Sequence, residues 1–194
     1  MKLFFIRHGQ TVANADQTYS GHSDVPLSEQ GRREAEALRS VLADIPFDRV
    51  YSSDLSRAID TQRLALPGVE GIRTTLLREY DVGALAGRAF GDPPKEFTGD
   101  MAYVRRMRDY TPFGGENAQM VRARLKAFLA QLEADPCENV AVFAHGGLMS
   151  CMLQIVLDAE IAPTAIAINN CCINVFDFNV QRWRLLAWNY RGSV

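Results

Sequence analysis

The sequence predicts an α/β protein in which helices cover both faces of a mostly parallel central sheet, a three-layer α/β/α sandwich. Short apolar runs alternate along the chain with stretches whose apolar residues recur at helical spacing. This alternation is expected where crossover helices join parallel strands. The 194 residues fit a single domain, residues 1–194, and contain no repeat or low-complexity tract.

Residues 2–6 form the first expected strand, because a short continuous apolar run is typical of a strand buried on both faces. The polar segment 9–26 contains glycine and proline and is expected to be a long loop. Ser28 is the expected N-cap of the following helix, with Glu29 in the first turn, where its charge complements the helix dipole. Apolar residues then recur at helical spacing until Pro46, which ends the helix.

A brief second strand is expected at residues 49–52, and Asp54 is the expected cap of a helix that runs to about Leu66. Residues 71–76 are expected to form a third strand. The segment 81–115 is irregular and rich in glycine and proline, so we interpret it as an insertion over the edge of the sheet.

One charged stretch within the insertion, residues 95–108, is expected to be helical. Residues 116–134 form a strong amphipathic helix, because their apolar residues lie on one stripe. The remaining expected elements are strand 139–144, a helix that ends at residue 157, and strands 173–178 and 182–188, which form a hairpin.

The composition limits the expected partners. A formal net charge of −2 and a pI near 5.9 give no overall attraction to nucleic acid or an anionic membrane. There is no apolar run of about 18 residues, and the apolar N-terminal run is too short for a signal peptide. The four cysteines lack metal-site spacing, and free thiols in a reducing cytoplasm are expected. A small molecule is the expected ligand of a monomer or homodimer.

Polar residues follow three of the expected strands. His8 follows the first strand, Arg57 lies just after the second, and His145 follows strand 139–144. Ligands of α/β proteins bind beyond the carboxyl ends of the strands, so these side chains are expected to converge. Both histidines precede glycine, which lets the backbone approach an anion, and the helix after Gly147 offers its N-terminus.

These residue types suit hydrolysis of a phosphate ester without a metal. Phosphoryl transfer spreads negative charge over oxygens that arginine can hold through rigid, permanently charged donors. A neutral imidazole nitrogen can attack phosphorus and divide one slow step into two, and histidine is largely neutral at pH 7. No sequence pattern of a metal site is present, so no metal and no cofactor are expected.

Several motifs occur in order along the chain. They are FIRHGQTVAN at residues 5–14, GHSDVPLS at 21–28, YSSDLSRA at 51–58, LRE at 77–79, GGE at 114–116 and VFAHGG at 142–147. In this order and spacing they resemble the histidine phosphatase superfamily, also called the phosphoglycerate mutase-like family.

The resemblance implies a phosphoglycerate mutase-like fold and a phosphohistidine intermediate on His8. Glu79 stands where the family places the acid that protonates the leaving oxygen, although an ordinary surface ion pair is an alternative for this residue. The residues implied to bind the phosphoryl group are Arg7, Arg57, His145 and Asn14. Further expected phosphate or substrate contacts are Gln10, Ser20, Gly21, His22 and Gly146.

Some positions are open at this stage. His22 can also serve loop packing, and the arginines in residues 105–108 can either face solvent or meet an acidic substrate group. Gln10 stands in place of a commoner Glu, Asn117 in place of a Ser, and residues 81–83 replace a more aromatic segment. The last departure leaves the substrate wall undefined.

We expect a phosphomonoesterase that acts on a small metabolite. The stretch from residue 19 through residue 50 is similar to α-ribazole phosphatases, which makes α-ribazole 5′-phosphate the first substrate to consider. Phosphoserine, phosphoglycerate and sugar phosphates are the alternatives. A mutase is a second hypothesis, but the compact insertion favours hydrolysis. A non-catalytic phospholigand-binding module is a third, although such a module has no need of a nucleophile and an acid.

Overall fold

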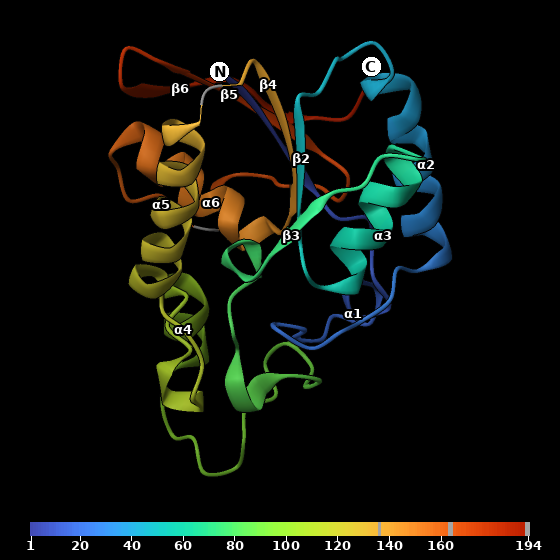
Figure 1. The fold of residues 1–194 in the computed structure, drawn as a ribbon. Coiled ribbons are helices and arrows are strands. Elements are labelled where there is room, and N and C mark those ends of the chain that lie inside the picture. The colour runs from blue at the N-terminus through green and yellow to red at the C-terminus, as the bar shows by residue number, and fades with distance from the viewer. Residues whose placement is uncertain (136, 163–164, 193–194) are drawn as a thin grey trace.

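A computed structural model of the chain describes residues 1–135, 137–162 and 165–192. The described strands form one six-stranded sheet in the order β3-β2-β4-β1-β5-β6 (Figure 1). The strands are β1 (Lys2–Arg7), β2 (Arg49–Ser53), β3 (Ile72–Thr74), β4 (Asn139–Ala144), β5 (Ile173–Asn179) and β6 (Arg182–Tyr190). The α-helices are α1 (Val12–Ala15), α2 (Glu29–Leu42), α3 (Ser56–Ala65), α4 (Met101–Met107), α5 (Ala118–Ala134) and α6 (Gly146–Leu157).

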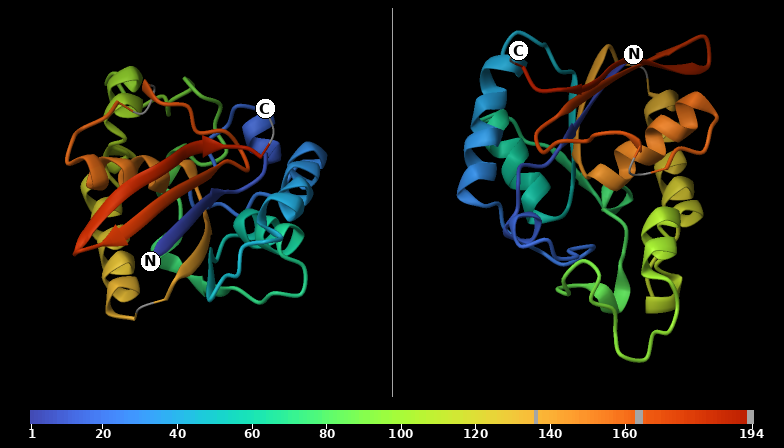
Figure 2. Two further views of the ribbon diagram at one scale, coloured as in Figure 1. Left: turned by 90° about the horizontal axis from the view of Figure 1, so that it is seen from above. Right: turned by 180° about the vertical axis from the view of Figure 1, so that it is seen from behind.

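The sheet is mostly parallel, as the sequence predicts. Strands β3, β2, β4 and β1 are parallel neighbours, while β5 runs antiparallel to β1 and β6 antiparallel to β5. Helices α2 and α3 cover one face of the sheet, and α5 and α6 cover the other (Figures 1 and 2). The predicted three-layer α/β/α class is therefore confirmed.

The central strand β4 shows why its sequence is a continuous apolar run. Val140 and Val142 pack into the core beneath α5 and α6, whereas Ala141 and Phe143 pack into the core beneath α2 and α3. All four side chains are fully buried. A strand covered on both faces has no polar side, so the alternation typical of half-exposed strands is absent.

The structure confirms one predicted helix cap, shows a second that the sequence did not predict, and contradicts a third. The side chain of Ser28 accepts a hydrogen bond from the backbone of Gly31 at 3.1 Å and starts α2, and Asn117 caps α5 in the same way. The prediction that Asp54 caps α3 is wrong. Its carboxylate accepts instead from the guanidinium of Arg78, at 2.6–3.1 Å, because a charged bidentate partner competes with the helix for it.

Two segments differ from their predicted form. The loop 9–26 contains the short helix α1, which is closed by a capping box between Thr11 and Asn14. The third strand ends earlier than predicted because the side chain of Thr74 caps the 3₁₀ helix Thr75–Leu77. Both differences come from side chains that bond to nearby backbone groups.

The segment 81–115 lies beyond the carboxyl ends of the parallel strands rather than over an edge of the sheet (Figure 1). It contains α4 and the 3₁₀ helices Gly83–Leu85 and Thr111–Phe113. Helix α4 is shorter than the predicted 95–108, because Asp100 caps it at its N-terminus. We call this segment the cap.

Two further properties of the described residues concern membranes and thiols. Over the described parts of the chain, no helix has the length and apolar character needed to cross a membrane. All four cysteines are free, and Cys151, Cys171 and Cys172 are buried.

Candidate active site

The three strand ends that the sequence predicts to converge are neighbours in the sheet. Strands β2, β4 and β1 lie side by side, so residues that follow them share one rim. His8 follows β1 and His145 follows β4, and their ring centroids lie 5.1 Å apart. Arg57, in the first turn of α3, donates from Nε to Nδ1 of His145 at 3.3 Å. The structure brings these three side chains together.

His8 keeps a free ring nitrogen. Its Nδ1 lies 2.7 Å from the carbonyl oxygen of Gly9, and because a carbonyl only accepts, Nδ1 carries the proton and Nε2 keeps its lone pair. The residue is 4% exposed. Burial, followed by the charges of Arg57 and Arg7, holds the pKa of His8 well below its usual 6.5. The imidazole is therefore neutral at pH 7, and Nε2 suits a nucleophile.

His145 adopts the opposite tautomer. Its Nδ1 accepts from Arg57, so the proton of the neutral ring lies on Nε2. Although Nε2 is buried, it has no hydrogen-bond partner within the described residues. Burial and the charge of Arg57 hold the pKa of His145 well below 6.5. Because buried donors are nearly always paired, this N–H marks a position for an acceptor such as a phosphoryl oxygen.

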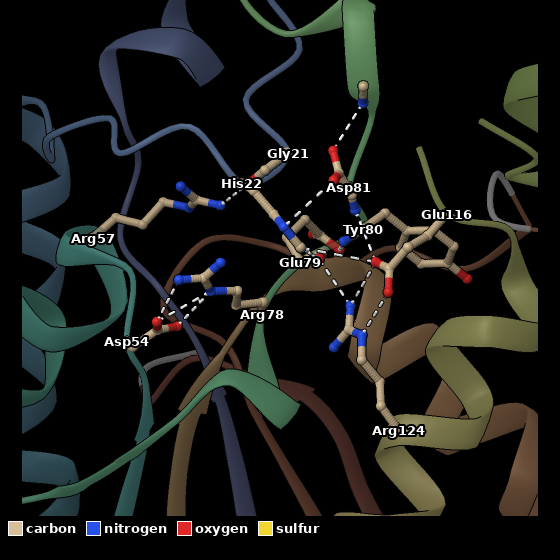
Figure 3. A network of polar contacts seen from close by, with 11 residues as sticks. Gly21, His22, Asp54, Arg57, Arg78, Glu79, Tyr80, Asp81, Glu116 and Arg124 are labelled. Atoms are coloured by element: carbon tan, nitrogen blue, oxygen red, sulfur yellow. Dashed lines mark hydrogen bonds and ion pairs between the residues drawn. The ribbon is translucent and has the colours of Figure 1, made fainter. Parts of the chain in front are cut away.

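Two arginines supply positive charge. Arg57 is 1% exposed, and its guanidinium donates to the carbonyl oxygen of Gly21 at 2.7 Å (Figure 3). It also donates to the carbonyl oxygen of Ser23 at 2.9 Å. Burial lowers the pKa of Arg57 to about 10, which leaves it charged at neutral pH. Arg7 donates from Nη1 to the carbonyl oxygen of Ile168, and its buried Nε lacks a partner in the described part of the chain. Each guanidinium is thus oriented by backbone carbonyls.

Glu79 lies at the N-terminus of α6. One carboxylate oxygen accepts from the backbone N–H of Tyr80 and the other from that of Gly147, both at 3.0 Å. A Cβ atom at Gly147 would lie 2.0 Å from Glu79 Oε1 and 2.6 Å from the ring of Tyr80, so a larger residue would displace the carboxylate. The N–H that the sequence suggests for anion binding therefore holds the carboxylate of the candidate acid.

These groups surround a pocket of about 710 Å³. Most of the site residues expected from the sequence line it: Arg7, His8, Asn14, Ser20, Gly21, Arg57, Glu79 and Gly146. His145 is next to two of these residues, since it accepts from Arg57 and its ring lies 5.1 Å from that of His8. The pocket therefore has a phosphate-sized cluster of donors at one end and a wider space under the cap.

Gln10 and His22 are not part of the pocket wall among the described residues. The side chain of Gln10 accepts from Ser28 Oγ at 2.8 Å, which fixes the loop after β1. His22 donates from Nε2 to the backbone carbonyl of Glu79 at 2.9 Å. Each side chain supports the site from outside, which differs from the direct contact that the sequence suggests and agrees with the alternative of loop packing for His22.

The cap contributes residues that sequence analysis did not assign. The cap side chains that line the pocket include Phe90, Arg105, Arg106, Arg108 and Tyr110. Tyr19, which follows α1, also lines the pocket and packs against Phe90 and Tyr110. Arg108 ends α4, with its guanidinium 5.4 Å from the ring centroid of Tyr80, and its buried Nη1 has no partner among the described residues. The cluster of arginines at residues 105–108 is the sequence feature that could have identified this wall. Its spacing does not show whether the side chains point into the pocket or toward solvent.

The match of the whole sequence decides the family. Residues 3–191 match the histidine phosphatase superfamily (branch 1). The chain belongs to this superfamily. Its predicted resemblance and phosphoglycerate mutase-like fold are therefore confirmed, and the chain is an enzyme of the phosphatase type.

Individual relatives of this histidine phosphatase are named for different activities. Adenosylcobalamin/alpha-ribazole phosphatase of Salmonella typhimurium is 34% identical over 161 residues, which cover 81% of this chain and 80% of that protein. A 2,3-bisphosphoglycerate-dependent phosphoglycerate mutase of Rhizobium etli is 36% identical over 163 residues, 78% of each protein. The crystal structure of a putative alpha-ribazole-5′-P phosphatase from Escherichia coli gives a TM-score of 0.88 at 29% identity, with coverage of 99% of this chain and 97% of that chain.

Proposed function

We propose that this histidine phosphatase hydrolyses a small phosphomonoester through a phosphohistidine on His8, without a metal. The observation that carries the proposal is the pair of complementary tautomers. His8 has a bare ring nitrogen, and His145 has a buried N–H without a partner among the described residues, on rings 5.1 Å apart. A nucleophile and a donor for a phosphoryl oxygen are thus held next to each other before any substrate binds.

In the first step, Nε2 of His8 attacks phosphorus and the bond between phosphorus and the ester oxygen breaks. Arg7, Arg57 and the Nε2–H of His145 hold the oxygens on which charge is spread. The leaving oxygen takes its proton from the carboxyl group of Glu79, so the alcohol departs neutral. Glu79 is then a carboxylate, stabilised by the two backbone N–H groups that it accepts from.

In the second step, water attacks the phosphohistidine and the bond between phosphorus and Nε2 of His8 breaks. Glu79 accepts the proton of this water and returns to its starting state. Inorganic phosphate leaves, and the balance is one ester and one water converted to one alcohol and one phosphate. No metal enters either step, because the arginines supply the positive charge.

Rapid quench with a ³²P-labelled ester tests the intermediate. The wild-type protein should accumulate label that is lost in acid and kept in alkali, and His8→Ala should accumulate none. The matched variant His145→Ala keeps the nucleophile and should still acquire label, but more slowly. Label on His8→Ala, or activity above about a tenth of wild type, would rule out this nucleophile. Activity should persist in a chelator.

For the substrate we propose α-ribazole 5′-phosphate. The wide end of the pocket has aromatic walls, Tyr19, Phe90 and Tyr110, which suit a flat apolar base attached to a ribose phosphate. The named activities of the Salmonella and Escherichia relatives support the same choice. Turnover of this ester should exceed that of glycerol 3-phosphate, which has no group to place against the rings.

The arginines of the cap favour a second candidate, a phosphoglycerate-type substrate. Arg105 and Arg108 line the pocket, and the unpartnered Nη1 of Arg108 suits a carboxylate or second phosphate on the leaving group. A mutase relative supports this reading. Kinetics on 3-phosphoglycerate and α-ribazole 5′-phosphate separate the candidates, and product analysis shows whether phosphate is released or returned. Arg108→Met should lower kcat/KM for the carboxylate ester by about 10-fold or more if that ester is native.

We further propose that residues 1–194 act as one domain with the cap at about 81–115, in the cytoplasm, as a monomer or homodimer that binds no nucleic acid. The free state of all four cysteines supports a reducing compartment. Sedimentation velocity at micromolar concentration measures the oligomeric state, and cell fractionation measures the compartment.

A further inference from the structure

Two arginine–carboxylate pairs hold the main chain on either side of Glu79 (Figure 3). Before it, Arg78 donates to both oxygens of Asp54, on the loop that leads to α3. After it, Arg124 of α5 donates to both oxygens of Glu116, at 3.0 and 3.1 Å. Bidentate pairs of this kind fix orientation as well as charge.

Arg124 also contacts the candidate acid itself. Its Nη2 donates to the backbone carbonyl of Glu79 at 2.8 Å, and its Nη1 donates to the carbonyl of Leu76 at 3.0 Å. The same Glu79 carbonyl accepts from His22 at 2.9 Å. A single guanidinium therefore connects α5 to the peptide from which the acid side chain projects.

Glu116 connects the same arginine to both ends of the cap. One of its carboxylate oxygens accepts from the N–H of Asp81 at 2.9 Å, and its own N–H donates to the carbonyl of Asp81 at 2.8 Å. A Cβ at Gly115 would lie 2.4 Å from that carbonyl, so the approach requires glycine. The first residue of the cap, Asp81, is thus bonded to Glu116, which directly follows the cap. This contact lies two residues from Glu79.

Neither partner of the pair lines the pocket within the described residues. Arg124 and Glu116 side chains are 15% and 14% exposed, so solvent screens their interaction only partly. Neither side chain is therefore placed to contact a phosphoryl group bound in that pocket. Arg124 reaches the site in two ways: it holds the carbonyl of Glu79, and its charge adds to burial in lowering the pKa of His145. Only the contact with Glu79 acts on the acid, because a change of charge at His145 would affect both classes of ester alike.

We infer that Arg124, paired with Glu116, is a positioning residue that sets the distance between the Glu79 carboxyl group and the leaving oxygen. The inference rests on the proposed role of Glu79 as the acid. Proton transfer requires heavy atoms within about 3.2 Å, and a displacement of about 1 Å can cost about 100-fold in rate. Loss of the guanidinium should therefore affect protonation of the leaving group more than phosphate binding.

The test is the kcat of Arg124→Met on one alkyl and one aryl phosphate, such as glycerol 3-phosphate and p-nitrophenyl phosphate. We expect a loss of about 10- to 100-fold on the alkyl ester and a loss of only about threefold on the aryl ester, whose oxygen needs little protonation. Arg122→Met is the matched control on the same helix, because Arg122 bonds to Gln154 and not to the acid. It should leave both rates unchanged.

Glu79→Gln provides the second measurement. If Arg124 acts through the acid, Arg124→Met should cause no further loss in the Glu79→Gln background. Equal losses on both esters, or full losses that multiply in the double variant, would overturn the inference. If Glu79→Gln alone shows no preference between the esters, the acid assignment itself fails, and the inference falls with it.

A folding defect is separated from a positioning effect by a milder variant. Glu116→Gln keeps the shape of the side chain and removes its charge, and circular dichroism reports whether each variant is folded. Glu116→Gln should show the same preference as Arg124→Met, with a loss of about 3- to 10-fold on the alkyl ester. A folded Glu116→Gln protein with equal rates on both esters, relative to wild type, would contradict the inference.

Discussion

Acidification should destabilise this protein through His8 and His145. Burial, assisted by neighbouring arginine charge, holds the pKa of both rings well below 6.5, so both are neutral in the folded protein. In the unfolded chain each ring titrates near 6.5. Below that pH the unfolded state binds more protons than the folded state. Their contribution to stability is therefore complete above 6.5 and is lost as the pH falls below it.

The magnitude follows from the unfolded value, provided that the folded rings stay neutral. The loss per histidine is RT ln(1 + 10^(6.5 − pH)), which is about 1.4 kcal/mol at pH 5.5 and about 0.06 kcal/mol at pH 7.5. The two histidines together should lower the free energy of unfolding by about 2.7 kcal/mol between these pH values. That is a large fraction of the ~5–15 kcal/mol typical of a domain.

Urea unfolding at pH 7.5 and 5.5 measures this difference. The buffers must lack phosphate and sulfate, because an anion in the pocket would stabilise the folded state. The double variant His8→Asn, His145→Asn is the control, since all other titrating groups are kept. Between these two pH values, the free energy of unfolding of the double variant should change by about 2.7 kcal/mol less than that of the wild type. For each single variant, this reduction should be about half as large. An unchanged pH dependence in the double variant would refute the reasoning.

Three substitutions test other contacts. Gly147→Ala places a Cβ 2.0 Å from Glu79 Oε1, so kcat on an alkyl ester should fall about 100-fold; an unchanged kcat would show that the acid is not held there. Ser28→Ala removes the cap bond from Gly31 and the bond to Gln10, so the free energy of unfolding in urea should fall by about 1 kcal/mol or more; an unchanged stability would show that Ser28 is not a working cap. Arg57→Lys keeps charge but loses the fork, so KM should rise and kcat should fall about 100-fold; near-normal kinetics would exclude a transition-state contact.

The sequence by itself determined the class of the fold. Residues 140–144 are all apolar because both faces of this strand are covered, and this property can be read without coordinates. The start of α2 could also be read, because Ser28 bonds to a backbone group only three residues away. Signals of this kind are local, so neighbouring residues suffice to predict them.

Part of the candidate active site could also be predicted from the sequence. His8 and His145 follow strands whose carboxyl ends meet in any parallel sheet, so their convergence with Arg57 needed only the topology. The motifs around them resemble one superfamily, and the match over the whole chain identified it. The tautomer of each histidine ring could not be predicted in this way, since it depends on the hydrogen-bond partner of the other ring nitrogen.

The tertiary structure decided the contacts between residues distant in sequence. Asp54 has the residue type and place of a helix cap, yet it pairs with Arg78, which is 24 positions away. Glu79 is held by Gly147, and its peptide by Arg124, across three separate elements. The sequence contains many arginines and backbone N–H groups that could serve as partners, and the packing of the layers decides which of them is within reach. The cap residues that line the pocket were also decided by tertiary packing, because the elements against which a short helix packs determine where its arginine side chains point.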